Sequence, residues 1–567
     1  MSHDIPAIVI LGHGSLATAR RIQRIYPDAQ IHGLVERVQD ADIHYTEFGA
    51  TLRHLYRQNT PIIALCSAGI VIRTLAPLML EKGAEPAVLA VAEDGSAVVP
   101  LLGGLGGVNV MAREIGAGLG IAPAITTSGE LRFGTCLLNP PAGYALGDLE
   151  SGKRFVSDLL SGEQVRIDGQ APWLADARLP QNPHAQRTIR VSCAEREPSP
   201  NELLIYPRSV LVAVSETGPQ LAERVRAALH EARIAGQSLA CLLAGDVHLA
   251  DVHVHQAAAQ LDVPVRFVST QSAGEMARSA VAQLLPPISV GEGIAITVTS
   301  EPLDVARIGR PRGRLAVIGL GPGAADLMVP AVKAELARAT DVLGYETYVR
   351  MAGPFRADQV QHCTDNREEM QRARHAFELA AQGRSVVVVS SGDPGVFAMA
   401  AAVLEALHDS GNPDWHAVDL EILPGVSASL ATAAQAGAPL GHDFCVMSLS
   451  DNLKPWEVIE TRLDLASQAD LALAFYNPIS RSRPWQLGRA LDIVRRHRSP
   501  ETPVTLGRDI GRPGQTLRII TLGQLTPDQV DMRTMVLIGS STTCTFPRPQ
   551  GGSWVYTPRW YGEKPTG

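Results

Sequence analysis

An apolar run that ends in closely spaced glycines is the feature that most constrains how this chain can fold. Residues 315–326 read LAVIGLGPGAAD, so four apolar residues precede three glycines. Such a run predicts a buried parallel strand that breaks into a tight loop before a helix. Glycine lets this loop approach a ligand closely and adopt positive φ. We expect the helix to begin near Asp326, its N-cap, with Pro330 early in it.

The residues of this loop leave two interpretations open. Gly319, Gly321 and Ala324 fit the dinucleotide-binding pattern G-x-G-x-x-G/A. An acidic residue, Glu346, follows about 20 residues later, as that fold requires. Pro322 argues against this interpretation, because its nitrogen carries no hydrogen to donate to a pyrophosphate. The alternative is a tight turn that binds no ligand.

Length and composition describe a globular protein of several domains. The 567 residues predict roughly three or four domains, and contents of 45% hydrophobic and 19% charged residues are typical of globular chains. The net charge of -8 offers no basic surface to nucleic acid or to an anionic membrane. No apolar stretch reaches the roughly 18 residues of a membrane span, and the first residues lack the basic region of a signal peptide.

The cysteines indicate a reducing compartment. All seven are scattered and none forms a C-x-x-C pair, so we expect reduced thiols in the cytoplasm and no zinc ribbon or iron–sulfur centre. His248, His253 and His255 lie close together, but their spacing implies no third ligand. We therefore expect a solvated helix start at these histidines and no metal site.

The first 140 residues alternate strands with helices. The expected strands are residues 7–11, 60–65, 86–92 and 124–127. Polar or glycine-rich loops at the strand ends, including residues 101–109, indicate an open α/β sheet. Two side chains in this region have alternative roles. His13 is either an acid–base group or structural, and Arg73 either holds a carboxylate or lies on a helix surface.

Residues 61–128 contain the strings AGIVIRTLAPL, EKGAEPAVLAVAEDG, GGLGGVN and AITTS. With these strings the region resembles the N-terminal domain of the cobalt-precorrin-5A hydrolase family, which opens a δ-lactone during corrin assembly and releases acetaldehyde. Leu102 and Gly104 stand where that family has Ser and His, groups that a hydrolase would use to polarise the lactone or position water. Two alternatives follow: an active lactonase, which would make the protein bifunctional, or a module that only binds corrinoids.

The middle of the chain carries weaker signals. Residues 141–202 are rich in Pro, Asp and Arg and have no long periodic run, so they are expected to form an insert or linker subdomain after the first domain, 1–140. Residues 203–302 resemble the C-terminal domain of the same hydrolase family. Residues 303–313 are expected to link this region to a C-terminal domain, 314–560.

Five further apolar strands in the C-terminal domain each end in a small or polar loop. They are residues 341–345, 385–390, 421–423, 471–475 and 503–506. Ligands bind at this edge of α/β sheets. Four of these loops carry SSGDPGVFAMA, PGVSA, FYNP and GRDIGRPGQ, and the loop after residues 315–318 carries GLGPG. With these strings the domain is similar to the tetrapyrrole methylase family, in particular its precorrin-3B C(17)-methyltransferase branch. The resemblance implies a two-lobed α/β fold and excludes the dinucleotide interpretation of Gly319.

The resemblance also implies the ligands of this domain. S-adenosyl-methionine would lie in a cleft between the lobes, and the domain would form a homodimer. The cofactor residues implied are Gly392, Asp393, Pro394, Val396, Phe397, Ser427, Ala428, Tyr476, Asn477, Gly507, Arg508 and Thr516. The loop of Gly321, Pro322 and Gly323 would face a tetrapyrrole substrate. Arginine suits the carboxylates of that substrate. The preferred candidates are Arg481 and Arg483, and the others are Arg350, Arg367, Arg508 and Arg512.

The implied reaction is methylation of precorrin-3B at carbon 17 with ring contraction to precorrin-4, in cobalamin biosynthesis. Contraction needs a group that removes a hydroxyl proton. The sequence leaves the choice open among the titratable residues of the motif loops, Asp326, Tyr345, Glu368, His442 and Asp509. We therefore expect a multidomain α/β enzyme in which a hydrolase-like N-terminal half is fused to a tetrapyrrole methylase.

Overall fold

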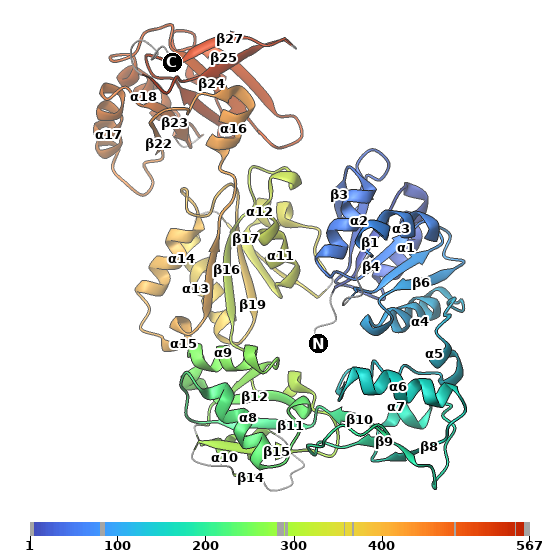
Figure 1. Ribbon diagram of the computed structural model, residues 1–567. Helices are drawn as coiled ribbons and strands as arrows, with labels where there is room; N and C mark the ends of the chain where they lie inside the picture. The colour runs from blue at the N-terminus through green and yellow to red at the C-terminus, as the bar shows by residue number, and fades with distance from the viewer. Residues whose placement is uncertain are drawn as a thin grey trace. The chain divides into compact units, whose positions relative to one another are not determined.

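The chain forms two compact units, Met1–Arg312 and Gly313–Gly567, which Figure 1 shows in a computed structural model. The structure describes residues 5–79, 85–270, 272–280, 288–289, 293–356, 358–365, 368–480, 483–549 and 551–560. Among these residues, no helix is both long and apolar enough to span a bilayer. The α/β architecture with several sheets confirms the expected fold class.

The first unit begins with a six-stranded sheet in the order β3-β2-β1-β4-β5-β6. Its strands are β1 (Ala7–Ile10), β2 (Gln30–Leu34), β3 (Ile43–Tyr45), β4 (Ile62–Leu65), β5 (Val88–Val91) and β6 (Val98–Leu102). Neighbouring strands are parallel except β5 and β6, which are antiparallel. The helices are α1 (Leu16–Gln23), α2 (Phe48–Arg57), α3 (Ala68–Leu75) and α4 (Val108–Leu119). Residues 124–127 are irregular rather than a strand, and α5 (Ser128–Phe133) follows them directly.

Two smaller sheets complete the first unit. One contains β7 (Tyr144–Leu146), β8 (Val165–Asp168), β9 (Arg187–Val191) and β10 (Glu202–Pro207), with α6 (Leu149–Leu160) and α7 (Pro172–Ala175). Most of this sheet comes from the segment expected to be an insert or linker, and Phe155 of α6 lies in its buried core. The other contains β11 (Val210–Val214), β12 (Leu239–Gly245), β13 (Val265–Val268), β14 (Ile288–Ser289) and β15 (Ile294–Val298), with α8 (Leu221–Glu231), α9 (Val252–Gln260) and α10 (Ala273–Ala280).

The second unit has two lobes, and the first lobe is a fully parallel sheet in the order β18-β17-β19-β16-β20. Its strands are β16 (Arg314–Gly319), β17 (Asp341–Tyr345), β18 (Val360–Thr364), β19 (Ser385–Ser390) and β20 (Asp419–Leu423), and its helices are α11 (Pro330–Arg338), α12 (Glu346–Ala352), α13 (Glu369–Ala381), α14 (Met399–His408) and α15 (Pro413–His416). Helices cover both faces, as Figure 1 shows. Alternate residues of β16 therefore pack in opposite directions: Val317 joins the core beneath α13 and α14, and Ile318 joins the core beneath α11 and α12.

The helix after β16 begins later than the sequence suggested. Asp326 lies in a short 3-10 turn, Ala325–Leu327, and is not an N-cap. The helix starts instead at Pro330, with Val329 as its N-cap residue. The proline decides this position, because its fixed φ suits the first helical turn and its missing N–H costs nothing there.

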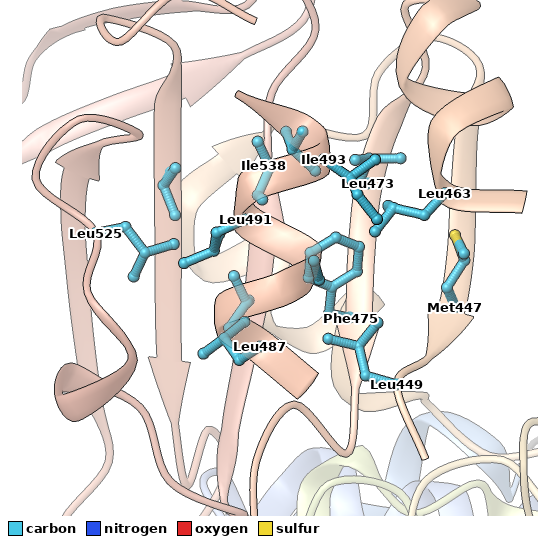
Figure 2. Close-up of a cluster of buried hydrophobic side chains, with 14 of the residues drawn as sticks. Met447, Leu449, Leu463, Leu473, Phe475, Leu487, Leu491, Ile493, Leu525 and Ile538 are labelled. Atoms are coloured by element: carbon cyan, nitrogen blue, oxygen red, sulfur yellow. The ribbon is translucent and has the colours of Figure 1, made fainter. Parts of the chain in front are cut away.

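The second lobe is a mixed sheet in the order β22-β23-β26-β24-β25. Its strands are β22 (Phe444–Ser448), β23 (Ala472–Tyr476), β24 (Pro503–Arg508), β25 (Thr516–Thr521) and β26 (Thr534–Ile538), and its helices are α16 (Ala428–Ala436), α17 (Trp456–Gln468) and α18 (Gln486–Val494). A separate small sheet joins β21 (Gly437–Ala438), β27 (Cys544–Pro547) and β28 (Ser553–Tyr556). Figure 2 shows the main core of this lobe, where Phe475 and Leu473 of β23 pack against Leu487 and Leu491 of α18.

Substitutions in this core should lower the stability of the second unit more than substitutions at its surface. Phe475 is fully buried, so Phe475→Ala should lower the free energy of unfolding by about 3–5 kcal/mol through lost burial and a cavity. Leu465 of α17 is 59% exposed, and Leu465→Ala should change it by less than about 0.5 kcal/mol. Urea unfolding followed by tryptophan fluorescence reports on this unit, because Trp173 is the one tryptophan of the sequence outside it. Equal losses in the two variants would contradict this assignment of the core.

Candidate functional site

Three loops of the first lobe meet at one edge of its sheet. They follow β16, β19 and β20, which are neighbours in a parallel sheet, so their carboxyl ends lie together. Gly321 and Gly392 form an isolated bridge: the Gly392 N–H donates to the Gly321 carbonyl at 2.7 Å, and the Gly321 N–H donates to the Gly392 carbonyl at 3.1 Å. The motif strings GLGPG and GDPG are thus joined by backbone hydrogen bonds.

The third loop approaches the other two so closely that only glycine fits. A Cβ on Gly425 would lie 2.2 Å from the Gly392 carbonyl oxygen and 2.7 Å from that of Gly319. A Cβ on Gly319 would likewise lie 2.4 Å from the Gly392 oxygen. Gly392 itself has φ +71, which favours glycine. These three glycines, which we call the glycine contact, hold the loops at fixed spacing.

Asp393 braces the glycine contact. Its Oδ1 accepts a hydrogen bond from the Gly395 N–H at 2.8 Å, and its Oδ2 accepts one from the Gly425 N–H at 3.0 Å. A charged acceptor strengthens both bonds. The carboxylate therefore ties the loop after β19 to the loop after β20.

Side chains of the two lobes also come together beside α16. Ser427, the N-cap of α16, accepts a hydrogen bond from the Leu430 N–H at 3.4 Å. The hydroxyl of Tyr476, at the end of β23, accepts one from the Ser429 N–H at 3.1 Å. The Tyr476 ring centre lies 5.4 Å from that of Phe397, which belongs to the first lobe and has the unusual φ of +52. This places an aromatic pair and several hydroxyl groups next to the glycine contact loops.

The loop after β24 connects the lobes through an arginine. Arg512 donates from Nε to the Pro322 carbonyl at 3.0 Å and from Nη2 to the Ser391 hydroxyl at 3.1 Å. Gly323 leaves the room for it, because a Cβ there would lie 2.6 Å from the Arg512 Cγ. The strings GLGPG and GRDIGRPGQ, far apart in sequence, therefore form one surface.

The first unit brings its own motif residues together around a buried acid. Glu130, which is 3% exposed, accepts a hydrogen bond from the Asn109 amide at 2.7 Å and pairs with Arg113 Nη2 at 2.6 Å. The same amide donates to the Thr127 hydroxyl at 3.0 Å. Leu102 ends β6, and Gly104 lies in the 3-10 turn before α4. The strings GGLGGVN and AITTS thus lie side by side.

Comparison with known proteins bears on both units. The family model described as Tetrapyrrole (Corrin/Porphyrin) Methylases matches residues 314–526, and the one described as Cobalamin synthesis G N-terminal matches residues 50–130. A precorrin-3B C(17)-methyltransferase from Sinorhizobium sp is 50% identical over 249 residues, which are 44% of this chain and 97% of that protein. The chain belongs to the tetrapyrrole methylase family.

Two further proteins are similar to the second unit of this chain, which we call the methylase. The cobalamin biosynthesis protein CobIJ of Mycobacterium tuberculosis is 44% identical over 300 residues, which are 51% of this chain and 56% of that protein. The crystal structure of the methyltransferase CobJ is 51% identical and covers 43% of this chain and 100% of that one, with a TM-score of 0.41. The family match confirms the methylase resemblance, and the match over residues 50–130 confirms the fusion with a cobalamin-synthesis region.

The arginines expected to bind substrate have protein partners in the methylase. Arg483 is 7% exposed and donates to the Asn477 carbonyl at 3.2 Å. Arg508 donates to Asp531 at 2.8 Å, and Arg350 pairs with Glu346 one helical turn away. Arg367 and Arg481 lie outside the described residues. Sequence spacing put these side chains near the site but could not show that folding already engages them.

Four of the five candidate proton acceptors lie at the loop edge of a methylase sheet. Asp326, Tyr345 and Glu368 follow or end β16, β17 and β18 in the first lobe. Asp509 follows β24 and lies 3.1 Å from Arg508 and 3.4 Å from Arg533. His442 differs, because it precedes β22 and so lies at the opposite end of the second sheet from Tyr476.

The structure also places the remaining residues that the sequence singled out. Thr516 faces Arg508 in the pairing of β24 with β25, and Gly507 packs against Thr432 of α16. In the first unit, His13 and Arg73 follow the parallel strands β1 and β4 at one edge. The Nε2 of His255 bonds the Leu249 carbonyl at 2.8 Å, and no cluster of three or more metal-ligating side chains occurs in the part of the chain that the structure describes.

Sequence reasoning missed Lys454, which lies between β22 and α17 with its Nζ 5.9 Å from the Phe397 ring centre. Burial, with the nearby charge of Arg462, lowers the pKa of this lysine. The segment around it carries none of the motif strings, so only the folded arrangement brings it to the site.

Because the three glycines of the glycine contact lie so close together, a side chain at Gly425 should destabilise the protein. Gly425→Ala should lower the free energy of unfolding by about 1–3 kcal/mol, because the new methyl group would push the loops after β16 and β19 away. Gly411 is the matched control, since a Cβ there meets nothing within 4 Å, and Gly411→Ala should stay within about 0.5 kcal/mol. Chemical denaturation of both variants measures the difference. If Gly425→Ala were as stable as the wild type, the close approach of the three loops would be wrong.

Proposed function

We propose that this chain transfers a methyl group from S-adenosyl-methionine to carbon 17 of precorrin-3B, with ring contraction to precorrin-4, in cobalamin biosynthesis. The observation that carries the proposal is the 50% identity to a precorrin-3B C(17)-methyltransferase over 97% of that protein. The five motif strings of the sequence lie on loops that contact one another, which supports a single site for cofactor and substrate.

The residues present suit this cofactor. It supplies an already activated methyl group, so the chain's task is to hold the two reactants in line rather than to provide a strong base. The glycine contact holds three loops at fixed spacing, and Asp393 keeps that spacing. Cofactor binding is assigned to the residues that the family resemblance implied, which are Gly392, Asp393, Pro394, Val396, Phe397, Ser427, Ala428, Tyr476, Asn477, Gly507, Arg508 and Thr516.

Ring contraction requires a proton acceptor near the substrate. We place it among Asp326, Tyr345 and Glu368, which end or follow parallel strands at the loop edge of the first lobe. Asp509 is a weaker candidate, because its carboxylate already pairs with Arg508 and Arg533. His442 is excluded from the proposal by its position at the far end of the second sheet.

For the first unit we propose a corrinoid-binding role without lactone hydrolysis. Leu102 and Gly104 replace the Ser and His of the similar hydrolases, while the Asn109–Glu130–Arg113 network is intact. The alternative is a bifunctional enzyme that also opens the lactone. The domain division 1–140, 141–202, 203–302 and 314–560, the cytoplasmic location and the homodimer are part of the same proposal.

Cofactor binding should depend on the brace at Asp393. Calorimetry of the full chain should show binding of S-adenosyl-methionine, and Asp393→Ala should weaken it about 10- to 150-fold, the effect of losing a hydrogen bond to a charged acceptor. Asp528→Ala, which removes an exposed carboxylate of the same unit, should bind like the wild type. Mass spectrometry of precorrin-3B incubated with the protein should show methyl transfer. A wild-type chain that binds no S-adenosyl-methionine would overturn the proposal.

The first unit should release little or no acetaldehyde from a lactone-bearing corrinoid. The wild type lacks both polar groups at positions 102 and 104, and an acetaldehyde assay with a coupled dehydrogenase measures the outcome. A Cβ on Gly104 would meet nothing within 4 Å, so the variant L102S/G104H should fold and tests whether these two positions account for the loss. Stoichiometric acetaldehyde from the wild type would instead establish the bifunctional alternative.

A further inference from the structure

A lysine, a phenylalanine and a tyrosine from both lobes of the methylase form a small group at the site. The Lys454 Nζ lies 5.9 Å from the Phe397 ring centre, within the range of a cation–π contact. The Phe397 ring in turn lies 5.4 Å from that of Tyr476. Phe397 is 52% exposed, and its φ of +52 is rare for an aromatic residue. An aromatic side chain held outward in this way is a surface on which a flat ligand can lie.

The charge that acts on the ammonium group of Lys454 comes from another cation, Arg462. In the part of the chain that the structure describes, no carboxylate pairs with it. Partial burial and the charge of Arg462 both act against the protonated form and lower its pKa. An incoming carboxylate would remove this electrostatic cost, because an opposite charge favours the protonated amine.

The three arginines near the site differ from Lys454, because each already donates to an acceptor in the protein. Arg512 spans the two lobes, Arg508 is paired with Asp531, and Arg483 is buried against the Asn477 carbonyl. Each of these guanidinium groups already has an acceptor in the protein. Lys454 is therefore the better candidate to bind an anionic group of a ligand.

We propose that Lys454 binds a carboxylate of the tetrapyrrole substrate while the macrocycle lies against Phe397, a residue that the family resemblance gave to the cofactor and that we reassign to the substrate. This inference rests on the proposed function and names a specificity residue for it. Both the tetrapyrrole and the amino-acid end of S-adenosyl-methionine carry carboxylates. We assign the contact to the tetrapyrrole, because Phe397 is 52% exposed and offers a flat apolar surface to a broad ring.

The test compares three variants of the full chain. Lys454→Gln should raise the KM for precorrin-3B about 10- to 150-fold, as expected for a lost charge-assisted contact, and leave kcat and the Kd of S-adenosyl-methionine within about twofold. Lys454→Arg, which keeps the charge, should recover most of the affinity. Lys153→Gln is the control, because it removes an exposed lysine of the first unit that pairs with Glu150, and it should behave like the wild type.

A binding measurement separates this inference from the proposed function. Quenching of tryptophan fluorescence by uroporphyrin III, a polycarboxylate tetrapyrrole that need not react, should show weaker binding to Lys454→Gln than to the wild type. If the wild type binds this probe through Lys454 but does not methylate precorrin-3B, the proposed reaction fails and the carboxylate contact stands. If Lys454→Gln binds both tetrapyrroles normally, or weakens only S-adenosyl-methionine, the assignment to a substrate carboxylate is wrong.

Discussion

The close approach of three backbones is the constraint on which the methylase depends. Gly319, Gly392 and Gly425 follow neighbouring strands, and two of them would collide with a carbonyl oxygen if they carried a Cβ. Sheet topology brings these loops together, and Asp393 fixes their separation with both of its oxygens. The second lobe contacts this assembly through the hydrogen bond of Arg512 to the Pro322 carbonyl and the ring contact of Tyr476 with Phe397. A contact built from backbone in this way requires glycine at its closest points, which explains why short glycine-rich strings stand out in the sequence.

The sequence was sufficient where hydrophobic pattern and glycine decide the structure. The strands at 341–345 and 385–390 have the expected bounds, because continuous apolar runs in a parallel sheet leave little choice of register. The start of α11 was misplaced, since Asp326 and Pro330 both favour a helix start and the proline prevails. Long polar side chains were the least predictable. Position along the chain could not show that Arg483 turns inward to the Asn477 carbonyl, or that Lys454 reaches an aromatic ring of the other lobe.

The first unit holds its motif residues together through a buried polar network. Asn109, Glu130 and Arg113 maintain a buried polar network that fixes α4 against α5, and such a network is costly to leave half satisfied. Gly104 lies in the adjoining turn, where nothing lies within 4 Å of the position that its Cβ would take. The turn therefore leaves room for a side chain at position 104. A region of this kind keeps its shape for a ligand whether or not it retains a reaction.

Arg512 makes the two lobes mechanically dependent on each other. Its guanidinium holds a carbonyl of the loop after β16 and a hydroxyl of the loop after β19, while its own backbone belongs to the loop after β24. Any movement that parts the lobes to admit or release a large ligand must break both hydrogen bonds at once. The resistance of these three loops to separation is thus concentrated in one guanidinium group.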